Sequence, residues 1–344
     1  MRRLIPAVAA AGVLLAAAPA ADAAVSLSGG TTRLTLDKGT AAALGSLGVG
    51  VAPTGPATAQ GRHVRFPISG GSIDPASGAG TIRHTGGLRL SAGGKRLVLK
   101  DYTVRVGRRI TLSARVGRAR VTVLDLTGTP RVSRSGFGTN VSGLTARLNR
   151  AAARALNATF GADVFRKGSP LGTVRVQAEP SQTELLAQGA TALAIDPGAL
   201  QAIVSLGIAP GVIGPATLDG TTASFPITGG KAALDLSAAT VRHSGGISLA
   251  KGATSVALTD FDIRVGAGAP QLFAALNGSA EKVAILDLDL AALQPAVQGR
   301  SITLGGVVAK LTQGAADALN AAFGTTAFAG GLVLGTATVS ATGK

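Results

Sequence analysis

Two stretches of the chain, TIRHTGGLRL at residues 81–90 and TVRHSGGISL at residues 240–249, are versions of one sequence placed 159 positions apart. In each, apolar and polar residues alternate and a glycine pair interrupts the alternation, which is typical of two antiparallel strands joined by a tight turn. The two stretches also contain two of the three histidines in the 344 residues. The repeat therefore bears on the fold and on the chemistry.

The repetition extends well beyond these stretches. LTLDKGTAAALGSLGV at 34–49 corresponds to LAIDPGALQAIVSLGI at 193–208, and the offset of 159 holds without a gap as far as Val106 and Val265. The offset grows to 162 at VLDL and ILDL and to 163 at LNATFG and LNAAFG, so the second copy contains a few extra residues. Two long copies favour two globular units over a solenoid of small repeats. We predict tandem homologous domains at residues 24–178 and 179–344.

Each copy contains signals for two short helices among many strands. Asp37 and Asp196 precede short apolar runs as helix N-caps, and Pro197 suits a first helical position. A second helix is expected after Asn149 in the first copy and after Thr312 in the second, ending at a glycine in each. The remaining sequence alternates as strands do. The predicted unit is mainly β, a β-sandwich or partly closed barrel with two helices.

The first residues, MRRLIPAVAAAGVLLAAAPAADAA, indicate export. Two arginines, a short apolar stretch and an A-x-A site form a secretory signal peptide at residues 1–23, so the mature chain is expected to begin near Ala24. We find no later segment long and apolar enough to span a membrane. The chain has no cysteine, which excludes disulfides and thiolate metal sites. We expect a protein that is secreted or associated with the cell envelope.

The repeated histidines fall on the apolar side of their strands. His84 shares its parity with Ile82, and His243 with Val241, so both imidazoles are expected among apolar side chains. A buried imidazole needs a hydrogen-bond partner, such as a backbone carbonyl, a Ser or a Thr. Two interpretations follow: a structural histidine, or a histidine that lines a pocket as a ligand or a metal donor. The candidate ligand-binding residues are His84, His243 and Tyr102, the only tyrosine.

The motifs of common enzymes are missing. No phosphate-binding glycine loop, nucleophile elbow or HExxH metal motif occurs. Asp101 and Asp260 occupy matching positions, as do Asp125 and Asp287, and strand-end hydrogen bonding explains them better than acid–base catalysis. We expect no enzymatic activity, no catalytic residues and no metal site.

Charge divides the two copies. Residues 31–180 contain 23 Lys and Arg against 6 Asp and Glu, a net charge of +17, whereas residues 181–344 contain 8 against 10, a net charge of −2. The candidate anion-binding residues lie around one hairpin: Arg108, Arg109, Arg118 and Arg120. An anionic cell-wall polymer or a membrane surface is the expected partner, and a solvated basic face is the alternative. Sequence-specific nucleic-acid binding is not expected, because no such motif occurs.

Three motifs carry a family resemblance: FPI[ST]GG, then RHxGG, then a segment ending in RVG after Tyr102 or Phe261. Over residues 64–106 and 223–265 the chain resembles the HtaA-type domain of exported actinobacterial haem-uptake proteins. The resemblance implies a β-rich unit that often occurs in tandem. It also implies haem bound through an axial tyrosine that a histidine supports.

The chain departs from the family's ligand pattern. It has no Trp, and no Tyr precedes Phe66. Tyr102 is Phe261 in the second copy, so no family ligand transfers residue by residue, and bound haem would need His84 or His243 as its ligand. The expected function is an exported tandem binding module for haem or another hydrophobic ligand. The alternative is a structural or adhesive envelope protein whose basic first domain binds anionic wall polymer.

Overall fold

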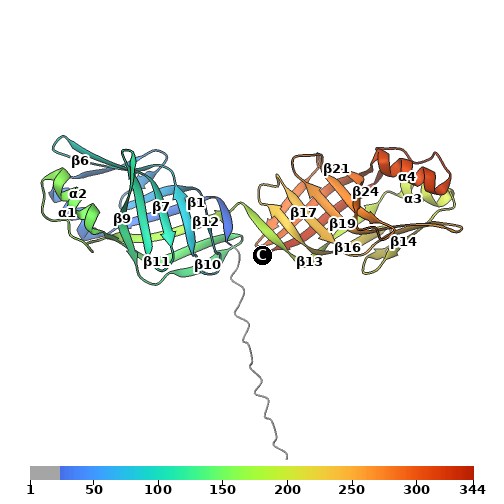
Figure 1. The fold of residues 1–344 in the computed structure, drawn as a ribbon, viewed down its shortest axis with the longest axis horizontal. Helices are drawn as coiled ribbons and strands as arrows, with labels where there is room; N and C mark the ends of the chain where they lie inside the picture. Colours follow the sequence, from blue (N-terminus) through green and yellow to red (C-terminus); the bar gives the residue numbers. More distant parts are fainter. Residues whose placement is uncertain (1–23) are drawn as a thin grey trace, which may run out of the picture.

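The computed structural model describes residues 24–344, so the predicted signal peptide lies outside the described residues. The described chain forms two sheets that share no strand pairing, one made of β1–β12 and the other of β13–β24. Four helices accompany them, two in each sequence copy. We call these copies the first unit and the second unit. In Figure 1 the helices of each unit lie at the end that points away from the other unit.

The strands of the first unit are β1 (Val25–Leu36), β2 (Gly50–Thr54), β3 (Thr58–Gln60), β4 (His63–Ile73), β5 (Gly80–His84), β6 (Gly87–Ala92), β7 (Lys95–Val106), β8 (Ile110–Val116), β9 (Ala119–Thr127), β10 (Arg131–Ser135), β11 (Gly138–Leu148) and β12 (Pro170–Pro180). The strands of the second unit are β13 (Gln182–Ile195), β14 (Ala209–Ile213), β15 (Thr217–Asp219), β16 (Thr222–Ala233), β17 (Ala239–His243), β18 (Gly246–Lys251), β19 (Thr254–Val265), β20 (Gln271–Leu276), β21 (Lys282–Asp289), β22 (Gln294–Gln298), β23 (Ser301–Leu311) and β24 (Val333–Gly343).

Each sheet closes on itself. In the first unit the hydrogen-bonded order runs β7-β5-β4-β1-β12-β11-β9-β8, and β8 pairs back with β7. In the second unit the order β19-β17-β16-β13-β24-β23-β21-β20 closes through β19 and β20. The paired strands are antiparallel throughout. The predicted mainly β unit is confirmed, and of its two predicted forms the closed one is observed.

Four capped helices cover one end of these sheets. They are α1 (Lys38–Ser46), α2 (Arg150–Phe160), α3 (Pro197–Ser205) and α4 (Gln313–Phe323). The N-caps are the four residues predicted from the sequence: Asp37, Asn149, Asp196 and Thr312, each accepting a hydrogen bond from the backbone of its helix. Gly161 and Gly324 end α2 and α4 in the left-handed conformation that glycine adopts without strain.

The core of each unit is aliphatic. Val, Ile, Leu and Ala make up most of the buried residues of each unit, and the buried residues form two separate clusters. The largest fully buried side chains include Ile73, Ile82 and Leu144 in the first unit and Ile208 in the second. Phe137, from the turn between β10 and β11, packs against the second cluster. Of the helices in the described part of the chain, none is both long enough and apolar enough to cross a membrane.

Candidate ligand-binding cavities

Each closed sheet encloses a cavity. The first cavity, in the first unit, has a volume of about 750 Å³, and the second cavity, in the second unit, has a volume of about 560 Å³. Both volumes lie within the range of small-molecule binding sites. The walls are aliphatic at corresponding positions, which include Leu34, Leu36, Leu88, Leu90, Leu97 and Leu99 in the first and Leu193, Ile195, Ile247, Leu249, Val256 and Leu258 in the second.

The helices form the mouth of each cavity. Ala151 and Ala155 of α2 line the first cavity, and Gly314 and Ala318 line the second from the corresponding turns of α4. These alanine and glycine residues are small and exposed, so they leave the opening unfilled. A valine at the same position of each rim is exposed to solvent, Val121 by 39% and Val283 by 49%. An exposed valine beside an apolar cavity continues the apolar surface outward.

Both repeated histidines line these cavities and are deeply buried. His84 is 3% exposed and His243 is 4% exposed. In the first unit Nδ1 of His84 lies 3.1 Å from the carbonyl oxygen of Tyr102, and Nε2 lies 2.6 Å from Oγ1 of Thr32. The partners are the two kinds expected from the sequence, a backbone carbonyl and a threonine.

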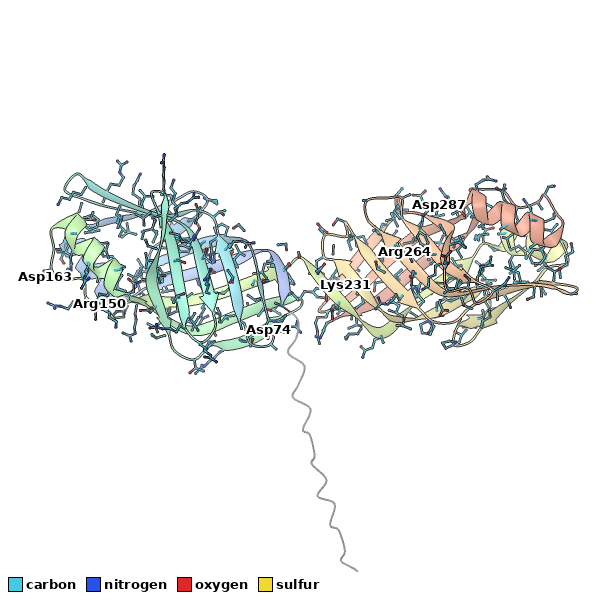
Figure 2. The ribbon with its side chains drawn as sticks, viewed as in Figure 1. Asp74, Arg150, Asp163, Lys231, Arg264 and Asp287 are labelled. Carbon is cyan, nitrogen blue, oxygen red and sulfur yellow. The ribbon has the colours of Figure 1, made fainter. Side chains whose placement is uncertain are left out.

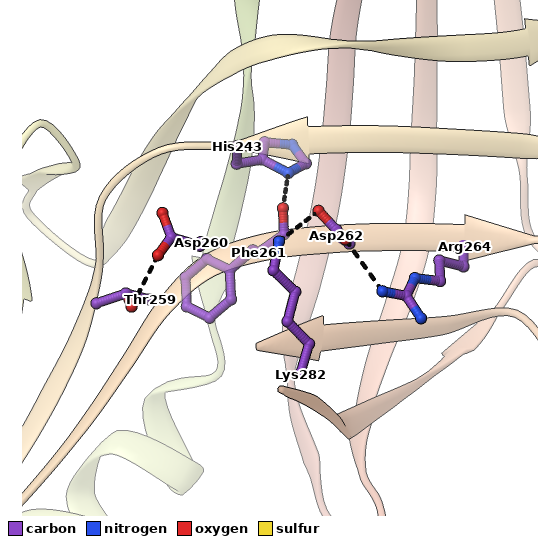
Figure 3. Close-up of polar contacts among 7 residues, drawn as sticks. All are labelled: His243, Thr259, Asp260, Phe261, Asp262, Arg264 and Lys282. Atoms are coloured by element: carbon purple, nitrogen blue, oxygen red, sulfur yellow. Dashed lines mark hydrogen bonds and ion pairs between the residues drawn. The ribbon is translucent and has the colours of Figure 1, made fainter. Parts of the chain in front are cut away.

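The second unit repeats this arrangement. Nδ1 of His243 lies 3.0 Å from the carbonyl oxygen of Phe261, and Nε2 lies 2.7 Å from Oγ1 of Thr191 (Figure 3 shows the carbonyl contact). A carbonyl only accepts hydrogen bonds, so Nδ1 is the protonated nitrogen. Nε2 then accepts from the threonine hydroxyl. Each imidazole is neutral, and both of its nitrogens are committed to the fold.

The pKa values support the neutral form. Burial lowers the pKa of His84 to about 4, and the hydrogen bond to Tyr102 only partly opposes this effect. Burial also lowers the pKa of His243; the hydrogen bond to Phe261 and the charge of Asp262 act in the opposite direction, whereas the charge of Lys282 adds to the lowering. Neither histidine is expected to carry a charge at neutral pH.

Tyr102 and Phe261 stand at the same place in the two cavities. Each ring packs edge-on against a second aromatic ring, with centroids 4.9 Å apart for Phe66 and Tyr102 and 5.0 Å apart for Phe225 and Phe261. Burial raises the pKa of Tyr102, so its hydroxyl stays protonated. The tyrosine hydroxyl therefore gives the first cavity a neutral polar group that the second cavity lacks.

A local kink precedes both rings. Asp101 and Asp260 have positive φ angles of 49° and 53°, and the pairing of β7 with β8 and of β19 with β20 shifts register at these residues. Such a bulge redirects the side chains that follow it. Asp101 pairs with Arg115, and Asp260 accepts a hydrogen bond from Thr259. The matched aspartates thus have structural partners on the strand surface.

On the outer face beside this bulge, the two units use different polar groups. In the second unit Asp262 binds Nζ of Lys282 at 2.9 Å and Nη2 of Arg264 at 3.1 Å (Figure 3). Burial would raise the pKa of Asp262, but the hydrogen bonds and charges of the two cations lower it. In the first unit Arg120 instead donates to Oγ1 of Thr103 and to the carbonyl oxygen of Asp101.

The four candidate anion-binding arginines do not form one patch. Arg108 and Arg109 lie in the turn between β7 and β8, and Arg118 lies in the turn between β8 and β9. These turns are at opposite ends of β8, a seven-residue strand that spans roughly 20 Å at about 3.4 Å per residue. Arg118 is at the mouth end, with Val116 and Ala119 of the first cavity. Arg120 already donates hydrogen bonds to Asp101 and Thr103 at the bulge.

An axially bound haem does not fit these residues. Nε2 of either histidine would have to give up its threonine before it could reach iron. Tyr102 has a raised pKa and no imidazole at its hydroxyl, and Phe261 offers no ligand at all. Among residues 24–344 no group of three or more His, Asp or Glu residues could hold a metal ion. The walls of both cavities are apolar, and both nitrogens of each histidine are already hydrogen-bonded.

The threonines that fix the histidines are the functional residues that sequence reasoning missed. Thr32 and Thr191 are each 52 residues from the histidine they contact. A signal for them existed, because the offset of 159 already relates Thr32 to Thr191. Both the threonine and the histidine repeat at this offset. Once their strands are known to lie close together, the repeat identifies the threonine as the partner of the histidine.

The fold and its cavities define a protein with two tandem closed β units, each with an apolar interior site. No protein-family model and no curated protein sequence matches the chain. The structure is similar to the C-terminal domain of HtaA from Corynebacterium glutamicum, with 14% identity, a TM-score of 0.37 and coverage of 45% of this chain and 98% of that domain. A domain-swapped dimeric variant of that domain gives 15% identity, a TM-score of 0.31 and coverage of 40% and 88%. The HtaA-type resemblance inferred from the glycine-rich motifs is thus found in the structure comparison too.

Proposed function

We propose that the chain is a non-enzymatic binding module that holds one hydrophobic ligand in each unit. The observation that carries this proposal is the pair of aliphatic cavities at the same place in both units, with volumes of about 750 and 560 Å³. An interior that only had to stabilise a fold would be packed close to the density of an organic crystal. The small residues at both mouths keep the two cavities open.

The choice of ligand follows from the walls. The polar side chains that face the cavities include a histidine and a threonine already bonded to each other in each unit, and Tyr102 in the first unit only. Such a site selects a ligand by the shape of its apolar part more than by the arrangement of its polar groups. The family resemblance suggests haem. Haem would have to bind here through apolar contacts of its ring, and neither histidine would coordinate its iron.

The experiment uses a neutral fluorescent probe, N-phenylnaphthylamine, titrated into the mature chain. We expect saturable binding at two sites per chain. Ala155→Trp should remove or weaken the first site and Ala318→Trp the second, because each places a large ring on an exposed, cavity-lining position of the mouth. Each variant is the matched control for the other.

Haemin provides the second arm of the experiment. We expect haemin to compete with the neutral probe but to give an absorption spectrum without histidine or tyrosinate ligation. A ligated spectrum that disappears in His84→Ala would contradict our assignment of the histidines. An absence of saturable probe binding in the folded chain would reject the proposed function itself.

We also propose that the protein acts outside the cytoplasm, in the envelope or the secreted fraction. The support is the sequence of residues 1–23, which has the charge and apolar pattern of a signal peptide. N-terminal sequencing of the protein recovered from culture supernatant or envelope should give a chain beginning near Ala24. Recovery of secreted protein that still carries Met1 would contradict this proposal.

A further inference from the structure

Cationic side chains surround the mouth of the first cavity. Each is exposed and belongs to an element whose neighbouring residues line the cavity. They are Lys38 of α1, Lys95 of β7, Arg150 and Arg154 of α2, and Arg166 and Lys167 of the loop after α2; Arg118, in the turn before β9, lies at the same end but is not counted with these six. Figure 2 labels Arg150 at this helical end of the first unit, with Asp163 nearby. We call these six residues the cationic rim.

Lys95 shows most directly that the rim faces the opening. It has the strand parity of Leu97 and Leu99, which line the cavity. Its Nζ reaches across the mouth to the end of α2, where it lies 3.9 Å from the position that a Cβ on Gly161 would occupy. At the corresponding place in the second unit, nothing lies within 4 Å of a Cβ on Gly324.

Helix stability does not explain the basic residues on α2. Arg150 is the first residue of the helix, and the first turn contains no acidic residue. A cation at a helix N-terminus is disfavoured by the helix dipole. No member of the cationic rim forms an ion pair among the residues that the structure describes. Asp163 is the acidic residue in the nearby loop, and Asp37 is engaged as an N-cap.

The second cavity has no such rim. At the positions that correspond to the six cations, the second unit has Pro197, Thr254, Gln313, Asp317, Ala329 and Gly330. Asp317 is exposed on α4 and accepts a hydrogen bond from Gln313. Glu281 also precedes β21, two residues before Val283, the exposed valine at the mouth of the second cavity. Lys251 is the cation on the matching hairpin of the second unit, where it pairs across the strands with Thr254 and shares the parity of the cavity-lining Leu249. The two cavities therefore have similar apolar walls, and the mouth of the first has more positive charge than the mouth of the second.

We infer that the first cavity selects a single-chain anionic amphiphile, with the apolar chain inside and a carboxylate or phosphate head held at the cationic rim. The second cavity takes the uncharged counterpart. This inference rests on the proposed function, because it assumes that the cavities bind apolar ligands. The rim charges act on a head group that stays partly in water, so their effect is screened by salt. They should also speed the capture of anionic ligands.

The test compares oleate with oleyl alcohol, which share one chain and differ in the charge of the head. The first cavity is measured in Ala318→Trp and the second in Ala155→Trp, by displacement of the neutral probe. We expect the first cavity to bind oleate about tenfold more tightly than the alcohol at low salt, because several rim cations each add a modest surface interaction. The preference should shrink in high salt. The second cavity should prefer neither ligand, or should prefer the alcohol.

Two sets of charge variants make the test specific. Lys95→Gln, Arg150→Gln and Arg154→Gln together should remove the oleate preference of the first cavity and leave its affinity for the alcohol unchanged. Thr254→Lys, Gln313→Arg and Asp317→Arg should create a preference for oleate in the second cavity. A further arm with oleoyl lysophosphatidate distinguishes the two head groups: equal or tighter binding than oleate assigns the rim to a phosphate, and weaker binding assigns it to a carboxylate.

Equal affinities of the first cavity for oleate and the alcohol at low salt would overturn the inference while leaving the proposed function intact. The same oleate preference in both cavities would also overturn it, because the second mouth lacks the rim. If neither ligand displaces the probe from either cavity, then the proposed function has failed instead.

Discussion

The first and second units have one architecture and two electrostatic surfaces. Their closed sheets, helix caps, buried histidines and aromatic pairs correspond residue by residue. Their net charges are +17 and −2 over residues 31–180 and 181–344, and their rims, outer polar networks and one cavity-lining aromatic residue differ. The shared features are those that closure and burial demand. The differences lie at positions where the fold tolerates many residues, which is where ligand selection can diverge without loss of the structure.

The largest expected effect appears in acid, where both units should lose stability because burial lowers the pKa of His84 and of His243. The pKa of His84 is about 4 in the folded chain, below the ordinary value of 6.5, so the unfolded chain takes up the proton first. The stabilisation is complete above pH 6.5 and is lost as the pH falls towards 4. The loss is about 3 kcal/mol, since one pKa unit corresponds to about 1.4 kcal/mol. Unfolding by urea between pH 7 and pH 4 measures it.

His84→Gln should flatten this pH dependence in the first unit, whereas His243→Gln should leave it in place. At neutral pH either replacement should cost about 1 to 3 kcal/mol in its own unit, because a buried hydrogen-bonded group is disturbed. A first unit whose stability is flat from pH 7 to pH 4 in the wild-type chain would show that His84 is not buried in its neutral form.

The outer polar networks predict the next largest difference. Lys282→Ala leaves Asp262, whose side chain is only 10% exposed, with Arg264 as its remaining cation, and should destabilise the second unit by about 1 to 3 kcal/mol. Arg120→Ala in the first unit removes bonds to a threonine and a carbonyl and leaves no buried charge, so it should cost about 1 kcal/mol or less. Thermal unfolding of the two variants gives the comparison. An equal loss in both would mean that Asp262 gains nothing from its pair of cations.

The aromatic position predicts a smaller effect. Tyr102→Phe makes the first cavity resemble the second and should change stability by about 1 kcal/mol or less, because the edge-on ring contact with Phe66 is kept. Phe261→Tyr places a hydroxyl in the second cavity and should cost slightly more. Denaturant titration measures both changes. A loss of several kcal/mol in Tyr102→Phe would show that the hydrogen bond between the hydroxyl and the backbone of Leu88 contributes more to stability than the ring packing.

The smallest expected effect on the fold comes from the basic residues away from the mouth. Arg108→Ala with Arg109→Ala should leave stability unchanged within about 0.5 kcal/mol, as exposed substitutions usually do. If the first unit binds anionic wall polymer, these replacements should weaken the binding and reduce its salt dependence. Arg118→Ala, at the other end of β8, is the matched control. Equal polymer binding by the first and second units would reject a partner chosen by charge.

The helix caps and the burial of the histidines could be predicted because both depend on local sequence. Asp37 and Asn149 cap helices through residues two or three positions away, and burial alternates along β5 from Ile82 to His84. The cavities could not be predicted in this way, because they depend on the closure of β7 against β8 and on the volume left inside. The bulge at Asp101 was also hidden, since a positive φ at an aspartate has no fixed sequence signature. The separation of Arg109 from Arg118 could have been read from the length of the intervening strand.

Sheet closure has a consequence for a chain that contains two copies of one sequence. Neighbouring homologous units can exchange strands and misassemble, and an open sheet edge is the usual template for such exchange. Among the residues described, the edge strands outside each ring are short, with three to five residues each: β2, β3 and β10 in the first unit and β14, β15 and β22 in the second. β2 and β14 each contain a proline, Pro53 and Pro210, which cannot donate a backbone hydrogen bond to an added strand. The same geometry that encloses the cavities therefore protects the tandem chain from aggregation with itself.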